Sequence, residues 1–445
     1  MRRNGHPHEE TVLAVYIAEA LPEAPTAART EPRTYAWIVF ALTFGLLLSD
    51  YMSRQVLNAV FPVLKVEWAL TDTQLGSLSS IVALLVGLLT FPLSVVADRW
   101  GRVKSVTLMA TLWSLATLGC AISANYNQML AARFFVGVGE AAYGSVGIAL
   151  ILSIFPAHLR STLSSAFMAG GPVGSVIGMA FGGVIAAQFG WRWAFGAMAA
   201  FGLALVVLYA LVVRENRLCP PEGTRRVAKT AERPGLREIF SGLFSSVSVI
   251  AAYVGSGLQL FIMAAMLAWL PSFLNRYYAL PTDKAGVGAA IFILVGAIGM
   301  VVCGIVTDRL SRPAPARKWT IAMTYSLISA ALLLVAFQLP AGNAQLALIA
   351  AGMAMVAGTT GPAGAMVANL THPSIHATAF ATLTLANNLL GLAPGPFVTG
   401  LVADRIGLMG AMQVVPLFAL GAVAAFAIGK RHYAADLKRI EAMQR

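Results

Sequence analysis

The chain has 445 residues, of which 58% are hydrophobic and only 11% are charged. Soluble domains carry about 25% charged residues, so this composition excludes a soluble globular protein and indicates an integral membrane protein. The formal net charge of +12 does not indicate a nucleic-acid partner, because the basic residues lie between apolar stretches and form no continuous patch.

The first 33 residues are polar and contain Pro22, Pro25 and Pro32, which favours a cytoplasmic N-terminal tail over a signal peptide. Twelve apolar stretches follow, each long enough to cross a bilayer as a helix, which takes about 20 residues. They lack the alternating pattern of a β-barrel, so we predict an all-α membrane protein with twelve transmembrane helices. The approximate bounds are 36–62, 74–97, 104–124, 127–154, 162–188, 193–213, 244–272, 285–307, 319–339, 343–370, 376–402 and 408–429.

The second and eighth stretches share one pattern, which indicates two similar halves. Gly76 precedes the pair Asp98-Arg99 by 22 residues, and Gly286 precedes Asp308-Arg309 by the same number. Between stretches six and seven lies the longest polar interval, whose paired prolines and dense charge predict a linker. The predicted organisation is a cytoplasmic tail (1–33), a six-helix bundle (34–213), a basic cytoplasmic linker (214–240), a second six-helix bundle (241–430) and a cytoplasmic C-terminal tail (431–445).

The distribution of lysine and arginine over the short loops predicts the orientation. Loops on the same side as the linker hold fifteen of these residues. Loops on the other side hold five, namely Lys65, Arg192, Arg276, Lys284 and Arg405. Because basic loops stay in the cytoplasm, both termini are predicted to be cytoplasmic.

Four charged residues fall inside predicted spans of the first half, where an ionisable side chain is costly and indicates function. Asp50 and Arg54 are four residues apart and share one helix face, and Arg133 and Glu140 are nearly two turns apart in the fourth span. We predict that Glu140 carries the proton, with Asp50 as the second candidate, and that Arg54 and Arg133 bind an anionic substrate. The alternative is a structural ion-pair cluster that holds the two helices together.

The second half has neutral polar residues in its spans instead of charges. Gln259, Asn387 and Asn388 are predicted to bind substrate together with Tyr143 of the first half; the three amides are equally compatible with hydrogen bonds between helices. Charged residues in the spans of the first half and neutral residues in those of the second favour an amphipathic substrate. The segments 170–174 and 391–396 combine glycine and proline at equivalent positions, and we predict broken, moving helices there.

Two six-span halves joined by a basic loop resemble the major facilitator superfamily. Its best-known signature, Gly-x-x-x-Asp-Arg-x-Gly-Arg, is similar to residues 94–102, with Ser94 where glycine is usual, and to the second copy at 304–309. The resemblance implies a proton- or ion-driven transporter fold and a cytoplasmic gate. The gate residues it implies are Asp98, Arg99, Gly101, Arg102, Asp308 and Arg309.

Several segments resemble the spinster-type branch of this superfamily and the related anion:cation symporters. They are residues 51–54, 70–76, 133–141 and 388–392. One departure is Ser53, which stands where the branch has aspartate. Asp50 lies three positions earlier, on a rotated face of the helix, so the resemblance supports Glu140 as a proton site more directly than it supports span one.

The predicted function is proton-coupled secondary transport of an organic anion or an amphipathic, lipid-like anion by alternating access. A proton-driven multidrug efflux antiporter is the alternative, and a non-transporting membrane receptor is a third hypothesis. No combination of residues typical of an enzyme stands out, and the glycine-rich stretches lack the Gly-Lys-Ser/Thr of a nucleotide-binding loop.

Neither a cofactor nor a metal is expected. Three cysteines, Cys120, Cys219 and Cys303, predict no disulfide framework. The expected partners are the substrate, protons and the lipid bilayer. We expect a monomer with many membrane spans in a bacterial inner membrane.

Overall fold

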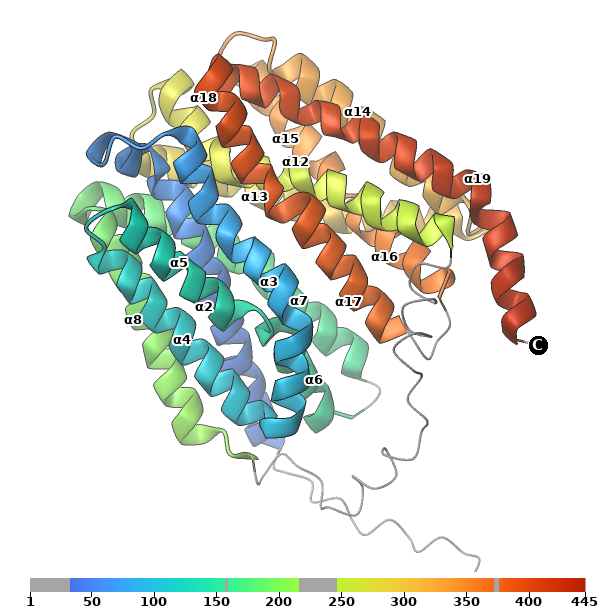
Figure 1. Ribbon diagram of the computed structural model, residues 1–445, viewed down its shortest axis with the longest axis horizontal. Coiled ribbons are helices and arrows are strands. Elements are labelled where there is room, and N and C mark those ends of the chain that lie inside the picture. Colours follow the sequence, from blue (N-terminus) through green and yellow to red (C-terminus); the bar gives the residue numbers. More distant parts are fainter. Residues whose placement is uncertain (1–32, 157–158, 216–245, 372–375, 445) are drawn as a thin grey trace, which may run out of the picture.

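The structure, a computed structural model, describes residues 33–156, 159–215, 246–371 and 376–444, and these are almost entirely helical. Figure 1 shows two helical bundles side by side, the first in blue to green and the second in yellow to red. The first bundle contains α2 (Arg33–Glu67), α3 (Asp72–Trp100), α4 (Arg102–Ile122), α5 (Tyr126–Glu140), α6 (Tyr143–Ile154), α7 (Arg160–Phe189) and α8 (Trp191–Val212). The second contains α12 (Val247–Tyr278), α13 (Thr282–Ser311), α14 (Arg317–Ala336), α15 (Asn343–Ala357), α16 (Thr360–Asn369), α17 (His376–Asn387), the π-helix η3 (Asn388–Leu392), α18 (Pro394–Val414), the short 3-10 helix η4 (Val415–Leu417) and α19 (Phe418–Gln444).

Eleven helical stretches among the described residues are long and apolar enough to cross a membrane. The last, Ala379–Lys438, has 60 residues and is interrupted at Gly407, where φ is 78°. Its two parts correspond to the eleventh and twelfth predicted spans, so the structure is consistent with twelve crossings. The predicted all-α membrane fold is confirmed. Most of the predicted tail 1–33 and linker 214–240 lies outside the described residues, and the domain boundaries stay predictions.

Two of the predicted spans are interrupted near their centres, at positions where no interruption was predicted. The fourth span divides into α5 and α6 at Ala141 and Ala142, directly after Glu140. The hydroxyl of Thr90 on α3 lies within hydrogen-bonding distance of the Ala141 carbonyl at this break. The tenth span divides into α15 and α16 next to Pro362, which has no N–H to continue the helical ladder.

The two predicted glycine–proline interruptions have different outcomes. In the second half, η3 precedes Pro394, so the eleventh span departs from α-helical geometry where expected. In the first half, α7 is continuous and contains Pro172 inside the helix. The prediction of a broken helix at 170–174 was therefore wrong, although Gly170, Gly171 and Gly174 do allow close packing against Phe44, Leu48 and Tyr51 of α2.

We distinguish two ends of the molecule. The terminal face contains the start of α2, the end of α3 and the start of α12, and the opposite face contains the α2–α3 turn and the start of α13. The largest hydrophobic cluster joins both halves near the opposite face, where the rings of Phe61 and Trp269 have centroids 5.5 Å apart. Two further clusters each belong to one half. The bundles therefore share a core toward the opposite face and have separate cores elsewhere.

Candidate functional site

One arginine between two buried carboxylates forms the centre of the site. The Nε of Arg54 lies 2.9 Å from Asp50 Oδ1 and 2.8 Å from Glu140 Oε2. Both carboxylates are buried, whereas the Arg54 side chain keeps 21% of its surface accessible. The sequence predicted the helical pairing of Asp50 with Arg54, and the structure adds Glu140 from α5 to the same guanidinium.

A single N–H group on Nε cannot donate well to both carboxylates, and its hydrogen bond goes to Asp50. Glu140 Oε2 therefore has an electrostatic contact with Arg54 but no hydrogen-bond partner among the described residues. Glu140 Oε1 lies 3.2 Å from the hydroxyl of Ser53, which is also 2.7 Å from the Asp50 carbonyl. The two terminal nitrogens of Arg54 donate to no described residue, so they are available to a ligand.

Two carboxylates and two arginines lie near one another here. With both carboxylates ionised, Asp50, Arg54 and Glu140 carry a net charge of −1, and the buried Arg133 nearby offsets it in a setting where burial penalises charge. A proton taken up by either carboxylate would change the total charge by one unit. Among the described residues no three His, Cys, Asp or Glu side chains come together as a metal site.

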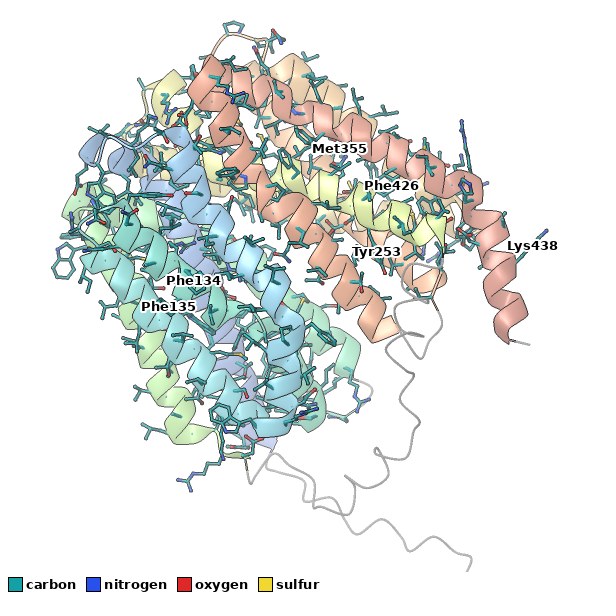
Figure 2. The ribbon with its side chains drawn as sticks, in the orientation of Figure 1. Phe134, Phe135, Tyr253, Met355, Phe426 and Lys438 are labelled. Atoms are coloured by element: carbon teal, nitrogen blue, oxygen red, sulfur yellow. The ribbon has the colours of Figure 1, made fainter. Side chains whose placement is uncertain are left out.

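Arg133 lies beside this group but uses its donors differently. It is buried, and its Nε and Nη1 each lie 3.2 Å from a backbone carbonyl, those of Leu78 and Ser53. It contacts no carboxylate within ion-pair distance in the described part of the chain. Arg133 therefore links α5 to α2 and α3 through hydrogen bonds and acts on Glu140 through its charge alone. On the same helix, Phe134 and Phe135 lie on the exposed outer face (Figure 2).

Tyr143 is fully buried at the start of α6. Its hydroxyl donates to the Thr43 carbonyl, and its ring packs edge-to-face on Trp113 with centroids 4.9 Å apart. Two glycines of this span, Gly137 in α5 and Gly144 in α6, differ in how closely their neighbours pack. A Cβ on Gly137 would lie 3.0 Å from Val82 Cα of α3, whereas Gly144 has nothing within 4 Å. Of these two glycines, Gly137 is the one that mediates close helix packing.

The polar residues of the second half gather around η3. Gln259 is buried, and neither its amide oxygen nor its amide nitrogen has a partner among the described residues. The same holds for the Oδ1 atoms of Asn387 and Asn388, while Asn388 Nδ2 donates to the Thr384 carbonyl over 2.9 Å. These unpaired amides are able to bind a polar ligand.

Helix α3 contacts both η3, which holds Asn388, and α5, which holds Glu140. A Cβ on Gly87 would lie 2.7 Å from Asn388 Cβ, and Val82 and Leu85 pack on Gly137 of α5. No described contact joins Gln259, Asn387 or Asn388 directly to Asp50, Arg54 or Glu140. The structure therefore places the two sets on either side of the seam between the halves.

The residues predicted as a cytoplasmic gate lie at the terminal face and are mostly exposed. Arg102 Nε lies 3.3 Å from Asp98 Oδ1, and Gly101 has a φ of 117°, a conformation that favours glycine. Arg99, Asp308 and Arg309 are exposed. In the described residues none of these side chains contacts the other half, so the gate stays a prediction about another conformation.

Sequence reasoning missed the polar residues that do connect the halves. Asp72 at the start of α3 is buried and contacts Arg276 of α12, and Asp404 of α18 contacts the same helix start. The available signal was the presence of Arg276 and Lys65 among the few basic residues of the opposite face.

Comparison with known proteins gives one consistent result. The model of the Major Facilitator Superfamily matches residues 43–396. Human protein spinster homolog 1 is 27% identical over 84% of this chain and 74% of its own length. The probable sphingolipid transporter spinster homolog 1 of Arabidopsis thaliana is 26% identical (76% of this chain, 74% of that protein), as is the probable L-galactonate transporter of Escherichia coli K12 (82% of each).

A solved structure has the same fold. It is a bacterial homolog of the human lysosomal transporter Spinster in an inward-facing, unoccupied conformation. It matches with a TM-score of 0.80 and 20% identity, covering 91% of this chain and 99% of that one.

Proposed function

The chain belongs to the major facilitator superfamily of membrane transporters, and from that premise we propose that it couples the movement of an organic anion to protons by alternating access. The observation that carries this proposal is the position of Arg54 between Asp50 and Glu140, with terminal nitrogens that donate to no residue in the described part of the chain. A transporter of this family is not an enzyme, so the group serves binding and proton exchange.

Proton coupling would follow from the charge of this group. When Glu140 takes up a proton, Arg54 keeps Asp50 as its counter-ion and loses the second negative neighbour. The arginine then attracts an incoming anion more strongly, and the bound anion in turn favours the protonated glutamic acid. Because this coupling is reciprocal, proton and anion bind together, which is the condition for symport.

The substrate class follows from the contrast between the halves. Arg54 offers a bidentate site for a carboxylate, sulfate or phosphate group. We propose that Gln259, Asn387 and Asn388 face the less charged part of the same molecule, while Arg133 and Tyr143 reach it only after rearrangement. The names of the relatives, one a probable sphingolipid transporter and one a probable L-galactonate transporter, support a lipid-like or organic anion.

The same proposal includes the cytoplasmic gate, the orientation in the membrane and the monomeric state. Asp98, Arg99, Gly101 and Arg102, with Asp308 and Arg309, would close the terminal face in the alternate conformation. Both termini would be cytoplasmic in a bacterial inner membrane, and the protein would function as a monomer.

Uptake into proteoliposomes tests the proposal. A panel of radiolabelled lysolipids, sugar acids and cationic drugs is presented with and without an imposed pH gradient. We expect an anion to accumulate only while the gradient stands and to leak out when a protonophore collapses it. Accumulation of a cationic drug in exchange for protons would replace the anion proposal with the multidrug antiporter. Absence of any transport across the panel would favour a receptor.

A further inference from the structure

A groove lies on the outer side of the first half, away from the candidate site. Helices α4 and α8 pack side by side there, at the edge of the first bundle that faces away from the second (Figure 1). The groove has a volume of about 600 Å³ and lies near the terminal face, between the start of α4 and the end of α8. None of its lining residues belongs to the candidate site, so a molecule bound here would lie outside the proposed transport path.

Two basic side chains line the terminal end of this groove. Lys104 lies in the first turn of α4, Arg214 follows the end of α8, and both are exposed. Among the described residues, neither side chain has a hydrogen-bond or ion-pair partner. The acidic residue of the lining, Glu215, is engaged with the backbone, because its two oxygens accept from the N–H groups of Arg102 and Val103 over 3.1 and 2.9 Å. The groove therefore offers two cations to an anionic group.

Contacts between three segments fix the backbone that carries these two cations. The Glu215 carboxylate caps the start of α4 beside Gly101, where φ is 117° and an added Cβ would lie 3.1 Å from Glu215 Oε2. From the start of α2, the Tyr35 hydroxyl accepts from the Arg214 N–H over 3.2 Å. The backbone at Lys104 and Arg214 is thus arranged before any ligand binds, which lowers the entropic cost of binding.

The rest of the groove is apolar and continues along α4 into the membrane-spanning part. Leu108 and Ala210 are exposed there. The hydroxyls of Thr107 and Thr111 donate to carbonyls one turn earlier in α4, so these side chains need no hydrogen bond from a ligand. From Lys104 to Thr111 the helix rises about 10 Å, roughly two-thirds of the hydrocarbon depth of one leaflet. This wall suits an acyl chain.

We infer that the groove binds a phospholipid with an anionic headgroup, whose phosphate lies on Lys104 and Arg214 and whose acyl chain follows α4. Basic pockets between transmembrane helices bind such headgroups. Trp100 also lines the groove and is 52% exposed, and tryptophan is enriched at the level of the headgroups. A free phosphate would use the cations but not the apolar wall. The inference rests on the membrane fold and not on proton coupling or on the transported substrate.

Photo-crosslinking in lipid tests the site. The full chain is reconstituted in phosphatidylcholine vesicles that contain a photoreactive phosphatidylglycerol with a diazirine in its acyl chain, and labelled peptides are identified by mass spectrometry. We expect labelling of residues 100–111 and 207–214, with competition by unlabelled phosphatidylglycerol but not by glycerol 3-phosphate.

The charge variant is Lys104→Gln combined with Arg214→Gln. It should lower groove labelling roughly thirtyfold, about fivefold for each cation near an anionic lipid surface. The matched control is Arg312→Gln combined with Lys430→Gln, an exposed arginine and lysine of the second half, and it should leave groove labelling unchanged.

A second variant leaves both charges in place. Ala210→Phe fills the apolar part of the groove, and since Ala210 is exposed, the melting temperature should stay unchanged while labelling falls. Labelling that neither variant lowers would overturn the inference, as would equal competition by zwitterionic phosphatidylethanolamine or full competition by glycerol 3-phosphate.

Arg54→Lys separates the groove from the proposed substrate site. This variant should leave groove labelling unchanged, whether or not transport is affected. Loss of groove labelling in Arg54→Lys would overturn the inference, because the lipid would then depend on the substrate site. If no substrate is found for the unmodified protein, the proposed function fails, but the crosslinking still decides on the groove.

Discussion

At the scale of single residues, Arg54 contacts two carboxylates, Asp50 of its own helix and Glu140 of α5. Its one Nε–H group serves Asp50, so Glu140 is held by charge and by Ser53 and not by a hydrogen bond from the arginine. Because the Glu140 carboxylate accepts a hydrogen bond from Ser53 and none at Oε2 among the described residues, its protonation would break few hydrogen bonds. This geometry makes Glu140, more than Asp50, the residue whose replacement should uncouple transport.

We expect Glu140→Gln to remove proton coupling while leaving the fold intact, because glutamine has the same shape and cannot ionise. In proteoliposomes with an imposed pH gradient, the accumulation ratio should fall to about 1, while exchange of labelled for unlabelled substrate continues. The control is Glu67→Gln, an exposed partner of Arg192 at the opposite face. Gradient-driven accumulation at the unmodified level would exclude Glu140 as the coupling residue.

Arg54→Lys tests whether the terminal nitrogens bind the substrate. Lysine keeps the positive charge but cannot offer a planar, two-nitrogen face while contacting Asp50. We expect the Kd for an anionic substrate to rise roughly tenfold or more, measured as the loss of ligand-induced thermal stabilisation. Arg192→Lys, in the exposed pair with Glu67, should leave the Kd unchanged. Equal affinities in the two variants would argue against bidentate binding.

At the scale of helices, two interruptions lie next to candidate site residues. The break between α5 and α6 directly follows Glu140, and η3 begins at Asn388. Interrupted helices occur at membrane depth where they line a cavity or are buried in protein. The first break has no proline to mark it, and the Thr90 hydroxyl from α3 supports its backbone instead. That support is a contact between helices, so it was not visible in the sequence of the span.

The close seam between α7 and α13 gives a prediction about helix packing. Gly183→Val would place methyl groups against the Thr282 carbonyl and Gly286 Cα, which lie 2.9 and 3.0 Å from a built Cβ. We expect the free energy of unfolding to fall by about 1–3 kcal/mol, as for other overpacked sites, seen as a lower melting temperature. Gly196→Ala, in α8 with nothing within 4 Å, should leave the melting temperature unchanged. A Gly183→Val protein as stable as the parent would contradict the tight seam.

At the scale of the whole molecule, orientation in the membrane is still a prediction from the loop charges. Val66→Cys lies at the opposite face and Lys104→Cys near the terminal face, and both positions are exposed. In intact cells with a permeable outer membrane, a membrane-impermeant thiol reagent should label Val66→Cys, whereas Lys104→Cys should react only after lysis. The reverse pattern would mean that both termini lie outside.

The sequence predicted the fold class, the approximate spans and the pairing of Asp50 with Arg54, because these depend on hydrophobic length and on helical spacing within one segment. It also placed Arg133 and Glu140 on one helix face. It did not predict that Arg133 would turn to the carbonyls of Leu78 and Ser53 while Glu140 turned to Arg54. Residues that share a face on one helix can meet different neighbouring helices.

What the sequence determined by itself is local: hydrophobic segments must be helices in lipid, because every backbone polar group there needs an internal partner. Which ends of the two halves touch was decided only by the tertiary structure. The Asp98-Arg99 and Asp308-Arg309 motifs are conspicuous in sequence but do not connect the halves here, while Asp72 and Asp404, 332 residues apart, do. Two conformations that differ mainly in which face is closed have the same helices and almost the same burial, so no local pattern chooses between them.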